Sequence, residues 1–123
     1  MNNELKVLQG EVYTIYFCKE ADKSLNEALS TVKDPNMMQI NLQVLLQKLA
    51  NGEKLNEITA ETSKSDKIKF WAIKKIPIRC YFWYSKNNKK HIYVSHFVHK
   101  KQQKLDKKDK QRVHRNWKNW EQT

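Results

Sequence analysis

Residues 78–104 read IRCYFWYSKNNKKHIYVSHFVHKKQQK, and this stretch decides the expected fold. Two runs rich in aromatic and β-branched residues, Ile78–Tyr84 and residues 91–98, flank a polar segment that has no apolar side chain to bury. Such runs are typical of strands that form a half-buried sheet surface. The pattern therefore predicts a β-hairpin whose loop is longer than the tightest two-residue turn.

The hairpin would gather basic side chains and imidazoles at one edge of the sheet. In an antiparallel pair the start of one strand lies beside the end of the other, so Arg79 would lie near the end of the second run. That end carries a cluster of side chains that can hold positive charge, namely His96, His99, Lys100 and Lys101. A cluster of this kind is suited to a polyanion such as RNA or DNA.

The positive charge of the chain is concentrated in its second half. The formal net charge is +11 over 123 residues. Residues 1–63 carry six Lys and Arg against nine Asp and Glu, whereas residues 64–123 carry eighteen against four. The second half also holds all four Trp and all four His, which is unlike the composition of a disordered tail. This distribution favours a folded anion-binding face over a solvated tail.

The length and the remaining composition predict a single cytoplasmic domain over residues 1–123. Cys18 and Cys80 lie in predicted strands without a metal-ligand spacing, which favours reduced, buried thiols over a disulfide. The sequence shows no signal-peptide pattern and no apolar run of about 18 residues, so we expect no membrane segment. No cofactor is expected.

Periodicity and capping signals predict the elements before the hairpin. Residues 12–18 are apolar on both faces and predict a well-covered strand. Residues 20–33 carry apolar side chains at helical spacing. Asp34, with the proline after it, predicts the start of a helix over Pro35–Ala50, and an Asn-Gly pair then ends that helix.

Two more elements complete the expected fold. Residues 67–73 predict a strand that turns through Pro77 into the hairpin. Residues Lys107–Glu121 predict a C-terminal helix whose Val and Trp side chains dock on the sheet. Residues 1–10 are polar and give no signal for a particular element, and residues 53–66 are expected to form a linker or a short irregular packing segment.

The predicted order is strand, helix, helix, three strands and helix. Consecutive strands joined by short links favour antiparallel pairing, and the first strand would join the same sheet after the two helices. The fold class is therefore α+β, with a mostly antiparallel sheet of about four strands, two N-terminal helices and one C-terminal helix. We expect the helices to stack on one face of this sheet.

Two motifs occur together at a suitable spacing, Arg79-Cys80-Tyr81 in the middle strand and HFVHKKQQK over residues 96–104. With the order of the elements, they resemble the RelE/HigB superfamily of bacterial toxins, in particular its phage-derived HigB-like branch. The resemblance covers residues 67–115 by motif, and residues 12–50 match only in element order. His96 stands where the family often has glycine. The resemblance implies a small RelE-like domain.

The resemblance also implies a function, that of the toxin in a type II toxin–antitoxin pair. Most characterised members are ribosome-dependent endoribonucleases that cut mRNA in the decoding site without a metal, and a cognate antitoxin protein restrains them. By position, Arg79 matches the strand arginine associated with phosphate contact and transition-state charge. Lys100 and Lys101 match the basic pair after the last strand. The implied partners are the antitoxin, the ribosome and mRNA.

These residue types suit cleavage of RNA by its own 2′-hydroxyl. The protein must assist deprotonation, neutralise charge on the phosphate and protonate the leaving oxygen. A guanidinium fork can bind two phosphate oxygens, and an imidazole can transfer a proton near neutral pH. The candidate catalytic residues are Arg79, His96, His99 and Lys100, and the candidate RNA-binding residues are Lys69, Lys74, Lys101 and Lys104.

Each candidate has a structural alternative. His96 lies in an apolar run and could be a hydrogen-bonded core histidine, whereas His99 could be an ordinary surface residue. Arg79 could pair with an acid across the sheet. The two histidines have no carboxylate or cysteine nearby in the sequence, so we expect no metal site.

Two alternative functions stay open at this point. One is a ParE-like toxin that inhibits DNA gyrase with the same fold and cuts no RNA. The other is a non-catalytic module that binds RNA or DNA. Loss of activity in an Arg79→Ala variant that still binds RNA would distinguish a nuclease from either.

Overall fold

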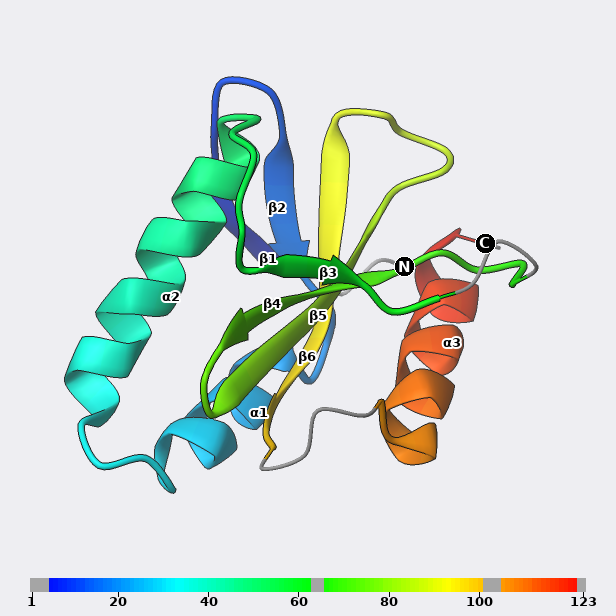
Figure 1. Ribbon diagram of the computed structural model, residues 1–123. Helices are drawn as coiled ribbons and strands as arrows, with labels where there is room; N and C mark the ends of the chain where they lie inside the picture. The colour runs from blue at the N-terminus through cyan, green and yellow to red at the C-terminus, as the bar shows by residue number, and fades with distance from the viewer. Residues whose placement is uncertain (1–4, 63–65, 101–104, 122–123) are drawn as a thin grey trace.

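The computed structural model describes residues 5–62, 66–100 and 105–121. These residues form six strands and three helices. Figure 1 shows the helices arranged around the single sheet that the strands build. The strand order across the sheet is β1-β2-β6-β5-β4-β3. In chain order the elements are β1 (Leu5–Gln9), β2 (Thr14–Phe17), α1 (Ala21–Leu29), α2 (Pro35–Ala50), β3 (Ile58–Ala60), β4 (Trp71–Lys75), β5 (Ile78–Tyr84), β6 (His91–His99) and α3 (Lys107–Glu121).

The prediction of a mostly antiparallel sheet of about four strands is wrong, because the sheet has six strands and is mixed. β2 and β6 pair in parallel, with Ile15 opposite Ile92, whereas the other neighbouring strands pair antiparallel. β1 and β3 extend the sheet at its two edges; β1 lies in a segment for which the sequence predicted no element, and β3 lies in a segment that we expected to be a linker or irregular. Both are short, so their alternation is too brief to separate from that of a loop.

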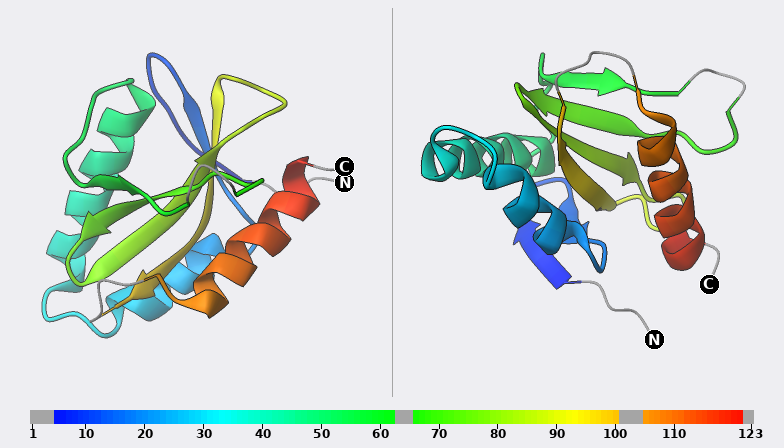
Figure 2. Two further views of the ribbon diagram at one scale, coloured as in Figure 1. Left: turned by 45° about the vertical axis from the view of Figure 1, so that its right-hand side comes forward. Right: turned by 90° about the horizontal axis from the view of Figure 1, so that it is seen from below.

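The helices cover both faces of the sheet, which corrects the expectation that they stack on one face (Figure 2). Alternate residues of β5 show the division. Ile78 and Phe82 belong to a core cluster with residues of α1 and α2, whereas Tyr81 and Trp83 belong to a second cluster with Val113 of α3. Because successive strand residues point to opposite faces, β5 has almost no exposed side chain.

Local signals place α2 as predicted. The Asp34 carboxylate accepts a hydrogen bond from the backbone N–H of Met37 at 3.1 Å, and Pro35 occupies the first turn. Gly52 follows the helix with a φ of +81°, a conformation that glycine adopts without strain. The predicted bounds of α2, β5 and α3 are confirmed.

α1 is shorter than the predicted helix over residues 20–33. It ends at Leu29, and the hydroxyls of Ser30 and Thr31 donate to the carbonyls of Glu27 and Ala28 at 2.6 and 2.7 Å. These side chains bond to the backbone in place of a further helical turn.

Gly10 allows the hairpin of β1 and β2 to touch the end of α2. A Cβ at this position would lie 2.3 Å from the backbone carbonyl carbon of Ala50. The backbone N–H groups of Val12 and Tyr13 both donate to the Ala50 carbonyl, at 3.0 and 2.8 Å. The absent side chain therefore lets the hairpin bond directly to the helix end.

Candidate functional site

A β-bulge in β6 turns two consecutive side chains toward α3. Tyr81 pairs with His96 and Phe82 pairs with Val94, so Ser95 has no counterpart on β5. An extra residue in one strand locally interrupts the alternation of side chains between the two faces. Ser95 and His96 are both fully buried, and both bond to side chains of α3.

A chain of buried and half-buried polar groups, which we call the polar relay, connects α3 to the end of β6. The Asn116 amide donates to the Ser95 hydroxyl at 2.8 Å, and that hydroxyl lies 2.7 Å from Nδ1 of His96. Nε2 of His96 lies 3.0 Å from one carboxylate oxygen of Asp109, and the other oxygen lies 3.8 Å from Nζ of Lys100. A carboxylate only accepts, so Nε2 carries the proton and Nδ1 of the neutral ring accepts from the Ser95 hydroxyl.

The environment of His96 holds its ring in the neutral form. Burial lowers the pKa of His96 below its ordinary value, and the hydrogen bond to Asp109 opposes this effect. The positive charges of Arg112 and Arg115 lower the pKa further. Because the side chain is fully buried, His96 can affect a ligand only through the neighbours that it orients, Asp109 above all.

A pocket of about 510 Å³, which we call the β6–α3 pocket, lies between the end of β6 and the first turns of α3. Its lining includes two acids, Asp106 and Asp109, of which Asp109 already bonds within the polar relay. The lining also includes His99 and more cations than acids, and these cations are Lys100, Lys108, Arg112 and Arg115. This balance of charge suits an anionic ligand.

Arg79 lies beside this pocket, opposite Val98, which lines it. Arg79 is buried, with a relative exposure of only 6%. Its Nη1 has no hydrogen-bond partner among the residues that the structure describes. The buried hydroxyl of Tyr81, on the same face of β5, also lacks a partner there. Burial and then the charge of Asp109 raise the pKa of Tyr81, while the nearby Arg79 guanidinium acts in the opposite direction. Buried polar groups are normally bonded, so the acceptor oxygens of a ligand would satisfy this arginine.

Lys74 extends the cationic face by one strand. It pairs with Arg79 across β4 and β5, and Nζ of Lys74 lies 3.5 Å from a carboxylate oxygen of Glu61. Paired residues of neighbouring strands point to the same face, so Lys74 lies on the α3 side with Arg79. Lys69 precedes β4 and is half-buried.

A hydrogen bond to Thr31 fixes the proton on the ring of His99. The Thr31 hydroxyl donates its proton to the carbonyl of Ala28 and also contacts Nδ1 of His99. Since that proton is already used, Nδ1 must donate to the hydroxyl. Nε2 of the neutral ring is then an acceptor, and within the described parts of the chain no partner occupies it.

Apart from Lys69, which precedes β4, the structure separates the predicted site residues that it describes into three groups. Lys74, Arg79 and Lys100 lie on the α3 side of the sheet, near or in the β6–α3 pocket. His99 lines the same pocket but its ring bonds toward the end of α1. His96 lies in the interior. Lys101 and Lys104 are outside the described residues.

Sequence reasoning missed the contribution of α3 to the site. Asp109 lies one turn before Val113 on the buried stripe of this helix, which marks it as an inward-facing acid. Arg112 and Arg115 are adjacent to that stripe and flank the pocket. This spacing could have identified Asp109, whereas the partners of Ser95 depend on the bulge and have no signal in the sequence.

The fold and the site together define a small α+β protein with a cationic pocket at one end of its sheet. Across residues 5–62, 66–100 and 105–121, no three His, Cys, Asp or Glu side chains are grouped closely enough to hold a metal ion. No helix in the same residues has the length and apolar character needed to cross a membrane. The sequence matches no protein-family model and no curated protein.

Proposed function

We propose that the β6–α3 pocket binds RNA and that the protein is the toxin of a type II toxin–antitoxin pair, cutting mRNA at the ribosome. The observation that carries this proposal is the excess of cations around a pocket that also holds His99, beside the buried Arg79, whose Nη1 has no hydrogen-bond partner among the described residues. Phosphate binding of this kind is governed by Lys and Arg contacts and weakens steeply with salt.

In this proposal the chemistry is attack of a 2′-hydroxyl on the adjacent phosphate. Nε2 of His99 accepts the hydroxyl proton, because Nδ1 already donates to Thr31. Arg79 and Lys100 stabilise the added negative charge on the phosphate, and Lys100 also supplies a proton donor near the leaving oxygen. His96 is a positioning residue, since it orients Asp109, which in turn lies beside Lys100.

The same surface supports the choice of partner. The outward residues of α3 are mostly basic, while its two acids, Asp109 and Glu121, are buried against the sheet. An antitoxin with an acidic segment would neutralise these cations and cover the pocket, and the ribosome would present the mRNA strand to it.

The test is inducible expression in bacteria with growth and mRNA 5′ ends measured for the wild type, Arg79→Met and His99→Gln. We expect growth arrest and new cuts in translated mRNA for the wild type, and neither for the two variants. Lys118→Gln is the matched control, because Lys118 is a cation of α3 outside the lining of the β6–α3 pocket. Arrest with intact mRNA would replace the nuclease with a ParE-like inhibitor of gyrase.

A non-catalytic RNA-binding module is the second candidate, and the burial of His96 favours it. Both ring nitrogens of His96 are bonded, so the described part of the pocket offers one accessible imidazole, that of His99. Retention of RNA by the purified protein at low salt, with no cleavage on or off the ribosome, would support this candidate.

A further inference from the structure

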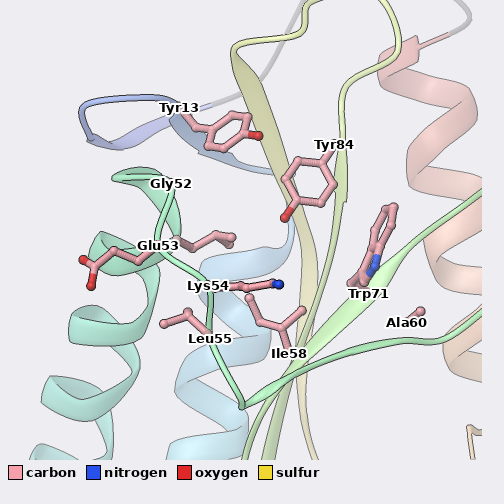
Figure 3. A pocket seen from close by; sticks show the side chains of 10 residues that line it. Tyr13, Gly52, Glu53, Lys54, Leu55, Ile58, Ala60, Trp71 and Tyr84 are labelled. Carbon is pink, nitrogen blue, oxygen red and sulfur yellow. The ribbon is translucent and has the colours of Figure 1, made fainter.

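A second pocket lies on the other face of the sheet, away from Arg79 and α3. It has a volume of about 390 Å³ and lies between the loop after α2, the edge strand β3, its neighbour β4, and the end of β5 (Figure 3). Its walls include Leu49 and Leu55, which belong to the core cluster on the α1 and α2 side. We call it the aromatic pocket. Its size is within the range of small-molecule sites.

Three half-buried aromatic rings form one wall of the aromatic pocket. The ring centroids of Trp71 and Tyr84 are 5.0 Å apart, and those of Tyr13 and Tyr84 are 5.5 Å apart. Each ring is partly exposed, so each has surface that a ligand can cover. In the described residues, neither tyrosine hydroxyl nor the Trp71 indole N–H has a hydrogen-bond partner. The wall therefore combines stacking surface with unused polar groups.

One charged side chain points into the aromatic pocket. In Figure 3 the Lys54 ammonium group is directed toward Trp71 and Tyr84, whereas the carboxylate of neighbouring Glu53 points away from them. No ion pair of Lys54 is found within the part of the chain that the structure describes. The pocket thus presents an ammonium group next to aromatic rings, and the nearest acid in its lining is turned outward.

We propose that the aromatic pocket binds a nucleotide, with the base stacked on Trp71 and Tyr84 and the phosphate held by Lys54. A planar base uses the exposed ring surface, since stacking of a base on an aromatic side chain contributes about 1–3 kcal/mol. The phosphate supplies the charge that Lys54 lacks. An aliphatic acid would use the lysine but leave the rings and the tyrosine hydroxyls without partners. This site goes beyond the RNA cleavage proposed above, because it lies on the opposite face from the β6–α3 pocket.

The test is titration of the full chain with AMP, adenosine and inorganic phosphate, followed by calorimetry and by the NMR signal of the Trp71 indole N–H. We expect AMP to bind and to shift the Trp71 signal, and adenosine to bind more weakly. Lys54→Gln should weaken AMP binding about tenfold and leave adenosine binding unchanged, a difference of about 1.4 kcal/mol. Lys48→Gln is the matched control, because Lys48 is exposed on α2 outside the pocket lining and should leave both affinities unchanged.

Three results would overturn the proposal. The first is that AMP does not bind at concentrations up to about 1 mM. The second is that the wild type and Lys54→Gln bind AMP with equal affinity, and the third is that the NMR shifts caused by AMP are confined to residues of α3. Because Lys54 is exposed, its replacement should not impair folding and the two proteins can be compared directly. A short single-stranded oligoadenylate identifies the source of the nucleotide. Tighter binding than AMP assigns a nucleotide within a strand, and equal binding assigns a free nucleotide. Growth arrest by the Lys54→Gln variant would persist if the RNA-cleaving toxin is correct, so the two proposals fail separately.

Discussion

Acid should destabilise the folded protein through His96, and replacement of this histidine by glutamine should remove that sensitivity. The His96 ring is fully buried and faces Asp109, Arg112 and Arg115 of α3. Burial, together with the two arginines, lowers the pKa of His96, and the hydrogen bond to Asp109 only partly opposes this effect. In the unfolded chain the same ring has an ordinary pKa of about 6.5.

The sign and the magnitude follow from the number of protons bound by each state. Between the folded pKa and about pH 6.5 the unfolded chain binds one proton at His96 that the folded protein does not. The free energy of unfolding therefore falls as the pH is lowered through this interval, by up to about 1.4 kcal/mol per pH unit. The stability that comes from the neutral His96 ring is fully present above about pH 6.5. Below the pKa of His96 in the folded protein, both states bind the proton and the free energy of unfolding falls no further on this account.

Urea unfolding of the wild type and His96→Gln at several pH values between 7.5 and 4.5 would measure this contribution. Glutamine keeps one acceptor and one donor for Ser95 and Asp109, so the variant should fold, with a loss of about 1–3 kcal/mol at pH 7.5. As the pH is lowered, the difference in free energy of unfolding between the wild type and His96→Gln should shrink by up to about 1.4 kcal/mol per pH unit. His114→Gln is the comparison on α3, because burial and then the charge of Lys110 lower the pKa of His114 in the same direction, so this variant should keep the acid sensitivity that comes from His96 and lose only the part that comes from His114. Parallel curves for the wild type and His96→Gln would refute the reasoning.

Three further substitutions test features of the fold and the site. Arg79→Met removes a buried guanidinium nitrogen that has no hydrogen-bond partner among the described residues, so the variant should have a free energy of urea unfolding about 1 kcal/mol higher than the wild type. The same variant should retain RNA less well in an anisotropy assay. A lower free energy of unfolding would contradict the stability prediction. Glu121→Ala removes the carboxylate that accepts a hydrogen bond from the Trp83 indole N–H at 3.0 Å, so it should lower the free energy of thermal unfolding by about 2–3 kcal/mol. Glu121→Gln keeps an acceptor for the indole and should lower it by less. Equal losses of stability in the two variants would argue against this hydrogen bond. Gly10→Ala places a methyl group against Ala50 and should cost about 1–3 kcal/mol, and an unchanged melting temperature would show that the hairpin can move away.

The parts of the fold with strong local signals were predictable from the sequence. α2 has a capping aspartate, a proline in its first turn and a glycine after its end, and β5 is a long aromatic and β-branched run. α3 has a regular apolar stripe. β1 and β3 have no comparable signal, because each is stabilised by pairing with one neighbour across the sheet rather than by its own sequence.

The candidate site was predictable only in part. The antiparallel hairpin explains why Arg79 lies opposite Val98 and near Lys100. The bulge at Ser95 could not be anticipated, because strict alternation would direct Ser95 and His96 to opposite faces. The prediction that all helices share one face of the sheet was wrong because the sheet is apolar on both faces, so the sequence pattern does not say which face α3 covers.

The strand order has a consequence for the way the protein is made. Synthesis produces β1, β2, β3 and β4 before β5 and β6, yet β6 and β5 lie at the centre of the finished sheet. The outer strands therefore leave the ribosome before the central strands that join them. Thr14 of β2, for example, can pair only after its partner His91, far along the chain, has been synthesised. Contacts of such long range form slowly, and unpaired strand edges recruit other chains in the meantime. Folding during translation should thus be nearly all-or-none, with closure of the sheet delayed until β6 has left the exit tunnel.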